Sequence, residues 1–452
     1  MANGHGHAPA ARSGVTPQGC CLAVLLTGSL GQAFTSSSVS TDRFPDRARS
    51  VRARHPAVLA GSAAAPSSSL AATWTLRPEA LAGLALSLGA ARGARGARGA
   101  RARVALCRAL PYGIAVLGTG STAPETVVSN DDLSEVMETT DEWITQRTGI
   151  RRRHVLQPEE SLVSLSVKAA KKALKDAQLA PEDVDLLIHA TSTPDDLFGS
   201  GPQVASLLGA ERATAFDLTA ACSGFVFALV TAAQYVRSGA FKNVLVVGAD
   251  CLSRFVDWSD RSTCVLFGDG AGAMVITQTE ASKDALLGFE MGSDGHGACH
   301  LGVCAENEQS VSVGGGKVAS STKFTPLGMN GKEVFRFATS RVPKTLSKLL
   351  ERSGVAPEEV DWLLLHQANR RIMDSAAKRL GVPQEKIICN LDEYGNTSAA
   401  SIPLALDEAI REGRVKKGDL LACCGFGAGL TWGGRRLLTA GRRKPTVCLE
   451  WG

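Results

Sequence analysis

The 452-residue sequence contains an internal repeat that limits its fold more than any other feature. Residues 168–189, KAAKKALKDAQLAPEDVDLLIH, recur at 344–366 as KTLSKLLERSGVAPEEVDWLLLH, an offset of 176 residues. A second pair, at 234–250 and 408–427, has an offset of 174. Each copy combines the apolar spacing of an amphipathic helix with a continuous apolar strand. The repeat therefore predicts two similar α/β halves whose sheets are covered by helices on both faces.

The repeat also divides the chain. We expect an N-terminal half over 109–284 and a C-terminal half over 285–439, between a leader, 1–108, and a tail, 440–452. With 44% apolar residues the chain is not disordered, and it has no apolar run of about 18 residues that would indicate a polytopic membrane protein.

Cys222 is the first residue that suggests chemistry. It follows a run of small residues and precedes a helical apolar pattern, so it is expected at a helix N-terminus. Backbone N–H groups and the helix dipole there would lower its pKa and favour the nucleophilic thiolate. A single cysteine among small residues is, however, more often a packing residue.

His366 and Asn396 strengthen the case for a site. His366 ends a buried strand, where ligand sites form in α/β sheets, whereas its first-half counterpart, His189, is expected to be structural. Asn396 lies in a Gly-Asn turn, and residues 397–400 follow the Cys222 segment by about 176 residues. We therefore expect Asn396 to face Cys222 across the two halves.

The motifs resemble those of the thiolase-fold condensing enzymes, and most closely those of the beta-ketoacyl-acyl-carrier-protein synthase III family. The matching runs occur in family order over roughly 112–438: DEWI at 141–144, RTGI at 147–150, AACSGF at 220–225, FGDGAGA at 267–273, HQAN at 366–369, GNTSAAS at 395–401 and FGAGLTWG at 426–433. The resemblance implies a thiolase-like fold, with two duplicated α/β halves in a five-layer αβαβα arrangement.

The resemblance also implies a catalytic triad of Cys222, His366 and Asn396. The elongating ketoacyl synthases have a second histidine in place of the asparagine. The implied reaction is ping-pong: Cys222 takes the acetyl group of acetyl-CoA, and malonyl-acyl-carrier protein then loses CO2 and condenses with it. Backbone N–H groups of Cys222 and Ala428, in the Gly-rich loop 425–429, would form the oxyanion hole. No cofactor or metal is implied.

Further roles follow from the same resemblance. Trp143 is expected to stack on the adenine of CoA with Arg261 on the other face, and Phe426 to support decarboxylation. Phe198 is similar to the residue that enters the acyl pocket of a second subunit, which implies a homodimer. Other CoA-binding residues are Arg147, Thr148 and Asn369. Basic residues expected to attract an acidic carrier protein are Arg336, Arg371, Lys378 and Arg379.

Three other functions are considered. A related synthase could prime polyketide synthesis or use a longer acyl-CoA, although Phe198 favours short chains. A silent acyl-binding subunit is disfavoured because all three catalytic residues are present. A papain-like hydrolase is disfavoured because it leaves the duplication unexplained. One departure from the family concerns the end of the chain, where Arg435 and Arg436 interrupt an expected apolar strand and put that strand in doubt.

The cysteines indicate neither a disulfide framework nor a clear metal site. The 12 cysteines are irregularly spaced, as expected of reduced, mostly buried thiols. His296, Cys299, His300 and Cys304 cluster in a Gly-rich loop, but their spacing matches no zinc template well.

The net charge of +5 is unevenly distributed. Residues 1–108 contain 13 arginines, no lysine and three acidic residues, a net charge of +10, which leaves −5 for the remainder. Short apolar runs at 20–26 and 80–90 flank an Arg- and Ser-rich segment. This pattern resembles the bipartite leader of plastid proteins in algae with secondary plastids, so we expect a plastid enzyme without stable membrane insertion. A secretory signal with a basic tail is the alternative. A nucleic-acid-binding arm is disfavoured because no aromatic residues alternate with the arginines.

Overall fold

The computed structural model describes residues 110–438, and the expected leader and tail lie outside them. The described residues belong to one compact unit built on two five-stranded mixed sheets. No helix among them is long and apolar enough to cross a membrane.

The first sheet comes entirely from the N-terminal part of the described chain. Its strands β1 and β6 flank β7 in antiparallel pairing, and β6, β4 and β5 are parallel. Strand β6 is buried along its whole length, as its continuous apolar sequence predicts. In spatial order the strands are β1 (Tyr112–Thr122), β7 (Asp269–Glu280), β6 (Asn243–Cys251), β4 (Leu186–Ala190) and β5 (Thr214–Leu218).

The second sheet repeats this topology. Its strands in the corresponding order are β8 (Leu286–Ser293), β16 (Thr431–Leu438), β15 (Leu420–Gly427), β13 (Trp362–Leu365) and β14 (Ile387–Ile388). The pattern of antiparallel and parallel pairs is the same. Strand β13 begins 176 residues after β4. The predicted duplication is therefore confirmed.

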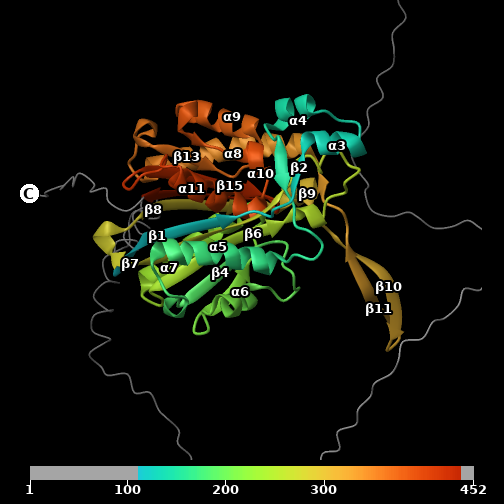
Figure 1. The fold of residues 1–452 in the computed structure, drawn as a ribbon, viewed down its shortest axis with the longest axis horizontal. Coiled ribbons are helices and arrows are strands. Elements are labelled where there is room, and N and C mark those ends of the chain that lie inside the picture. Colours follow the sequence, from blue (N-terminus) through green and yellow to red (C-terminus); the bar gives the residue numbers. More distant parts are fainter. Residues whose placement is uncertain (1–109, 439–452) are drawn as a thin grey trace, which may run out of the picture. The chain divides into compact units, whose positions relative to one another are not determined.

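Helices form three layers around the two sheets (Figure 1). Each layer corresponds to one of three clusters of buried apolar side chains. Helices α5 (Leu162–Ala177) and α6 (Gly201–Leu208) cover the outer face of the first sheet. Helices α7 (Gly224–Ser238) and α11 (Ser401–Arg411) lie between the sheets, and α8 (Gly331–Arg352) and α9 (Arg370–Leu380) cover the second sheet. This is the expected five-layer arrangement.

Shorter elements surround these layers. They are α3 (Asn130–Val136), α4 (Asp141–Thr148), α10 (Leu391–Tyr394), the pair β2 (Val127–Ser129) and β3 (Arg152–His154), and the pair β9 (Leu301–Gly302) and β12 (Gly328–Met329). Strands β10 (Ala305–Val313) and β11 (Gly316–Phe324) form a hairpin that projects from the body (Figure 1).

The doubt about the last strand was wrong. Strand β16 pairs with β15 over its full length and with β8 over 431–437, and Arg435 and Arg436 are buried within it. Pairing on both sides satisfies the backbone of β16, and this outweighs the unfavourable burial of two arginine side chains. The Arg435 guanidinium lies 5.4 Å from the Phe225 ring centroid.

Candidate active site

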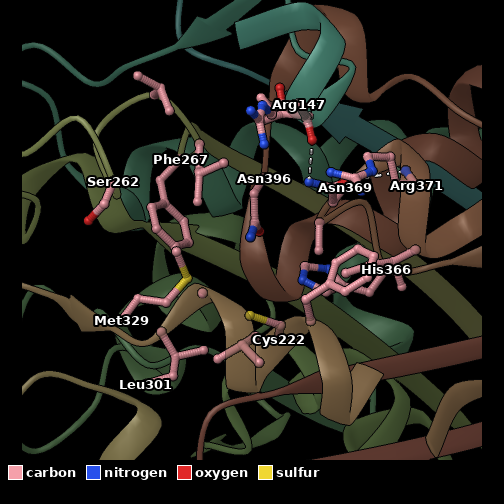
Figure 2. A pocket seen from close by; sticks show the side chains of 18 of the residues that line it. Arg147, Cys222, Ser262, Phe267, Leu301, Met329, His366, Asn369, Arg371 and Asn396 are labelled. Atoms are coloured by element: carbon pink, nitrogen blue, oxygen red, sulfur yellow. Dashed lines mark hydrogen bonds between the residues drawn. The ribbon is translucent and has the colours of Figure 1, made fainter. Parts of the chain in front are cut away.

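A cavity of about 350 Å³ brings together residues from both halves of the repeat. It lies where segments at the carboxyl ends of β5 and β13 meet. Figure 2 shows Cys222, His366 and Asn396 directed towards the same space. The predicted site residues that line the cavity are Trp143, Arg147, Thr148, Cys222, Arg261, His366, Asn369, Arg371, Asn396 and Phe426.

Cys222 lies in a single 3-10 turn, η3 (Ala221–Ser223), immediately before α7. Ala221 adopts φ 49, a left-handed conformation that costs free energy in a non-glycine residue. The thiol is 7% exposed, and burial raises its pKa to about 12. The expectation of a lowered pKa was therefore wrong, because desolvation outweighs the hydrogen bonds that favour the thiolate. The resting site holds a protonated thiol.

Ser398 is a contact of Cys222 that the sequence interpretation missed. Its hydroxyl donates to Cys222 Sγ at 3.4 Å, and the two residues are 176 positions apart, the offset of the repeat. Ser398 begins the turn η9 (Ser398–Ala400) before α11, and its φ of 51 matches that of Ala221. The repeat offset was the signal that could have identified it.

Asn396 is held with its amide nitrogen available. Its Oδ1 accepts a hydrogen bond from Ser398 N at 3.0 Å. Its backbone bonds Leu266 O and Gly268 N at 2.8 and 3.1 Å. Because the oxygen is engaged and the residue lines the cavity, the NH2 group is the part that can serve a ligand, as a donor.

His366 follows β13 and is 1% exposed. Its Nδ1 lies 2.7 Å from the Ser401 hydroxyl, and its ring packs edge-on against Phe426 at 5.1 Å between centroids. Burial lowers the pKa of His366 to about 3. The imidazole is therefore neutral at physiological pH, and can donate one hydrogen bond but carries no charge.

Gly427 brings backbone close to Cys222. A Cβ on Gly427 would lie 2.8 Å from Cys222 N and 3.2 Å from Cys222 Sγ, so a side chain there would meet the nucleophile. Gly427 lines the cavity, whereas the adjacent Ala428 does not. The Thr431 hydroxyl lies 2.9 Å from the carbonyl oxygen of Ala220 and 3.0 Å from that of Ala428, so it links the turn that carries the Ala428 N–H to the segment before Cys222.

The rim of the cavity is aromatic and basic. Trp143 on α4 is 36% exposed, with the Arg261 and Arg147 guanidinium carbons 4.8 and 5.9 Å from its ring centroid. Asn369 donates to Arg147 O at 3.1 Å, which joins α4 to the start of α9 (Figure 2). The guanidinium of Arg371 stacks over Phe335 at 5.3 Å.

Other predicted residues lie away from the cavity walls. Phe198 is 95% exposed, and its neighbour Leu197 is 83% exposed. Lys378 and Arg379 lie exposed in the last turn of α9, with Arg379 donating to Thr339 O on α8. Arg336 on α8 is exposed and pairs with Glu333.

His189 has only protein contacts, and the loop that contains Cys299 and Cys304 lies at the surface. His189 is fully buried, with Nε2 3.0 Å from the Ser166 hydroxyl and Nδ1 3.4 Å from Asp217 Oδ2. Residues 110–438 hold no group of three or more His, Cys, Asp or Glu side chains that could bind a metal ion, so the loop with Cys299 and Cys304 forms none.

Comparisons with known proteins find similarity over most of the described chain. Residues 216–295 match the family model for 3-oxoacyl-[acyl-carrier-protein (ACP)] synthase III, and residues 350–437 match the model for its C-terminal part. A beta-ketoacyl-[acyl-carrier-protein] synthase III of Microcystis aeruginosa is 57% identical over 325 residues, covering 72% of this chain and 97% of the relative. A chloroplastic one of Arabidopsis thaliana is 53% identical, covering 72% and 83%. The crystal structure of the Aquifex aeolicus enzyme aligns with a TM-score of 0.64 at 44% identity, covering 72% of this chain and all of that one.

Proposed function

The chain belongs to the beta-ketoacyl-acyl-carrier-protein synthase III family, and we propose that it catalyses the priming condensation of type II fatty-acid synthesis. Acetyl-CoA and malonyl-acyl-carrier protein give acetoacetyl-acyl-carrier protein, CO2 and CoA. The observation that carries the proposal is the cavity in which a buried thiol, a neutral imidazole and a free amide NH2 line one space.

In the first half-reaction, Cys222 takes the acetyl group. Its sulfur attacks the thioester carbonyl, the bond from carbon to the CoA sulfur breaks, and the thiol proton leaves with CoA. The N–H groups of Cys222 and Ala428 stabilise the tetrahedral oxyanion. The closeness of Gly427 to Cys222 supports this, since it leaves room for an oxygen where a side chain would stand.

In the second half-reaction, malonyl-acyl-carrier protein loses CO2. His366 and Asn396 each donate a hydrogen bond to the malonyl thioester carbonyl and so stabilise the enolate. The enolate carbon attacks the acetyl carbonyl, a carbon–carbon bond forms, and the carbon–sulfur bond to Cys222 breaks. One proton from solvent restores the thiol. A neutral His366 suits this role, since a donor is needed rather than a base, and Phe426 packs beside it.

The rim supports recognition of CoA. Trp143 would stack on adenine, and Arg261, which now covers the ring of Trp143, would move to the outer face of the base. Arg147, Thr148 and Asn369 would line the path to Cys222, and they line the cavity already.

The proposed reaction can be tested by following a labelled acetyl group from acetyl-CoA. Purified protein is incubated with labelled acetyl-CoA, with and without malonyl-acyl-carrier protein. Without malonyl-acyl-carrier protein we expect the label on the protein, and with it we expect the label in acetoacetyl-acyl-carrier protein. Cys222→Ser should take up no label, whereas Cys299→Ser, which changes an exposed thiol, should behave as wild type. Absence of product from acetyl-CoA, with product from longer acyl-CoA esters, would favour the related synthase instead.

We further propose that the enzyme is a homodimer in which Phe198 enters the acyl pocket of the partner. The support is that Leu197 and Phe198, which are adjacent in the sequence, expose two large apolar side chains. Exposed apolar patches of this kind often mark protein–protein contacts. A monomer in sedimentation experiments would contradict this. Phe198→Ala should widen the range of accepted acyl chains.

A plastid location is proposed from the arginine-rich leader and from the chloroplastic relative. The finer proposal is a secondary plastid reached through a bipartite leader. Residues 1–108 fused to a fluorescent reporter should direct it to the plastid, and a secreted or cytosolic reporter would overturn the assignment.

A further inference from the structure

The imidazole of His366 is held by a single buried hydroxyl. Ser401 is the first residue of α11 and is 2% exposed, and its Oγ lies 2.7 Å from His366 Nδ1. The other ring nitrogen, Nε2, has no hydrogen bond to any described residue, and the ring lines the cavity. Nδ1 is thus bound to the protein, and Nε2 remains for a ligand.

The neutral imidazole of His366 has two tautomers, and they differ in the hydrogen bonds that the ring and the Ser401 hydroxyl can make. If Nε2 carries the proton, the Ser401 hydroxyl donates to Nδ1 and the pair is satisfied. If Nδ1 carries the proton, it donates to Oγ, and the hydroxyl proton must find another acceptor. Ser401 makes no other side-chain hydrogen bond within residues 110–438. A buried hydroxyl without an acceptor is unfavourable, so the first form is favoured.

We propose that Ser401 is a positioning residue that holds His366 as the Nε2–H tautomer, so that the imidazole faces the cavity as a hydrogen-bond donor. This inference rests on the proposed function and specifies how its second half-reaction is prepared. Asn396 is oriented similarly, because the Ser398 amide holds its oxygen and leaves its NH2 free. Two donors are thereby fixed before the malonyl thioester arrives, so the site need not reorganise during decarboxylation.

The first half of the repeat provides a contrast. His189 lies near the end of the buried strand β4 and also contacts a buried serine, but this serine is Ser166 on α5, and it contacts Nε2. The Nδ1 of His189 faces Asp217. Both nitrogens are therefore occupied within the protein, and neither residue lines the cavity. Ser166→Ala removes the same type of contact at the same burial, and is a matched control.

The direct test measures the tautomer in the intact protein. Histidine labelled with 15N distinguishes Nε2–H from Nδ1–H by two-bond proton–nitrogen correlations, and the His366 signal is identified by its absence in His366→Gln. We expect Nε2–H in the wild type and a mixture of tautomers in Ser401→Ala. An Nδ1–H signal in the wild type would overturn the proposal, whether or not any variant folds.

The kinetic test separates the two half-reactions. In Ser401→Ala we expect kcat for condensation to fall about 10- to 100-fold, the range for losing a group that orients a functional side chain. The KM for malonyl-acyl-carrier protein and the rate of Cys222 acetylation should stay within about threefold of wild type. Ser166→Ala should keep wild-type rates, and Ser401→Thr, which retains a hydroxyl, should recover most of the loss.

Two outcomes contradict the proposal. If Ser401→Ala keeps the wild-type kcat for condensation, the Ser401 hydroxyl does not determine the tautomer of His366. If the rates of acetylation and condensation fall equally, Ser401 has a general structural role. A wild type that forms no acetoacetyl product would instead refute the proposed function, while the NMR result still decides the tautomer.

Discussion

His366 illustrates how burial determines the chemistry of a residue. In water an imidazole titrates near neutral pH and often serves as a base. Here desolvation lowers the pKa of His366 to about 3, so the ring remains neutral at any physiological pH. The ring is consequently a weak base that can still donate one hydrogen bond, which suits the stabilisation of an enolate.

The same pKa shift predicts a pH-dependent stability. Unfolded His366 binds a proton below about pH 6.5, whereas the folded form binds none until about pH 3. Stability is therefore lost as the pH falls below 6.5. By pH 5.5 the free energy of unfolding should fall by about 1.4 kcal/mol from this residue alone.

Urea unfolding of wild type and His366→Gln at pH 7.5 and 5.5 isolates this effect, because glutamine does not titrate. The stability difference between the two proteins should shift by about 1.4 kcal/mol in favour of the variant at pH 5.5. Parallel pH dependences would show that folded His366 takes up protons in the same range as the unfolded chain.

The limits of sequence interpretation are clearest at this scale. Cys222, His366 and Asn396 were predicted from motifs, and the structure brings them together at one cavity. The protonation state of Cys222 was mispredicted, because desolvation depends on what packs around a thiol rather than on its own sequence. Ser401 was missed for a related reason, since its contact joins residues 35 positions apart.

At the scale of elements, β16 buries a guanidinium whose contacts include an aromatic ring and a thiol. Arg435 is fully buried beside Phe225 and Cys423, and none of its guanidinium nitrogens reaches a hydrogen-bonding oxygen in the described chain. Burial lowers its pKa, which indicates that the charged form is disfavoured there. An apolar side chain of similar size should suit this position better.

Arg435→Leu is therefore expected to stabilise the protein by about 1–4 kcal/mol in denaturant unfolding. Arg436→Leu is the matched control: the Arg436 side chain retains a hydrogen bond to Ser353 O at 3.3 Å, so its replacement should gain less. A loss of stability in Arg435→Leu would mean that the guanidinium makes a favourable interaction within the core.

The β10–β11 hairpin is the opposite case, an element that buries almost nothing. All but one of its residues are exposed. It turns at Gly314 and Gly315, whose φ values of 58 and 83 suit a two-residue turn. Below the hairpin the chain is already closed by two hydrogen bonds between Cys304 and Thr325.

Replacing 306–323 by Asn-Gly should consequently change the free energy of unfolding by less than about 1 kcal/mol. The Ala305–Phe324 pair remains to close the shortened turn. Thermal and denaturant unfolding would detect the change, and a loss above about 2 kcal/mol would show that the hairpin supports the body.

This hairpin was not predicted, and the reason is physical. Its strands have no apolar face that alternates cleanly, because neither side packs on a core. The main helices and strands, in contrast, must each bury one or two faces. Their apolar residues therefore follow regular patterns, as in the repeat at 168–189 and 344–366.

At the scale of the whole molecule, a basic rim lies on an acidic body. Residues 109–452 carry a net charge of −5, whereas α9 carries Arg371, which lines the cavity, and Lys378 and Arg379 in its last turn. We propose that an acidic carrier protein, repelled by the average charge, would be attracted by the basic residues of α9, so a single charge on this helix should affect its binding.

Lys378→Glu is expected to raise the KM for malonyl-acyl-carrier protein about three- to tenfold without changing the KM for acetyl-CoA. Added salt should reduce the difference from wild type. Lys171→Glu, an equal charge change on the exposed face of α5, should leave both constants unchanged. Equal effects of the two substitutions would exclude a local docking surface on α9.

Burial of the Cys222 thiol also determines how the resting protein withstands oxidative stress. Peroxides and alkylating reagents attack exposed thiolates, but this sulfur is protonated and 7% exposed. Cys299 and Cys304, by contrast, lie exposed at the surface. Peroxide should therefore modify these two loop thiols before Cys222, and the protein should remain active after both have been oxidised.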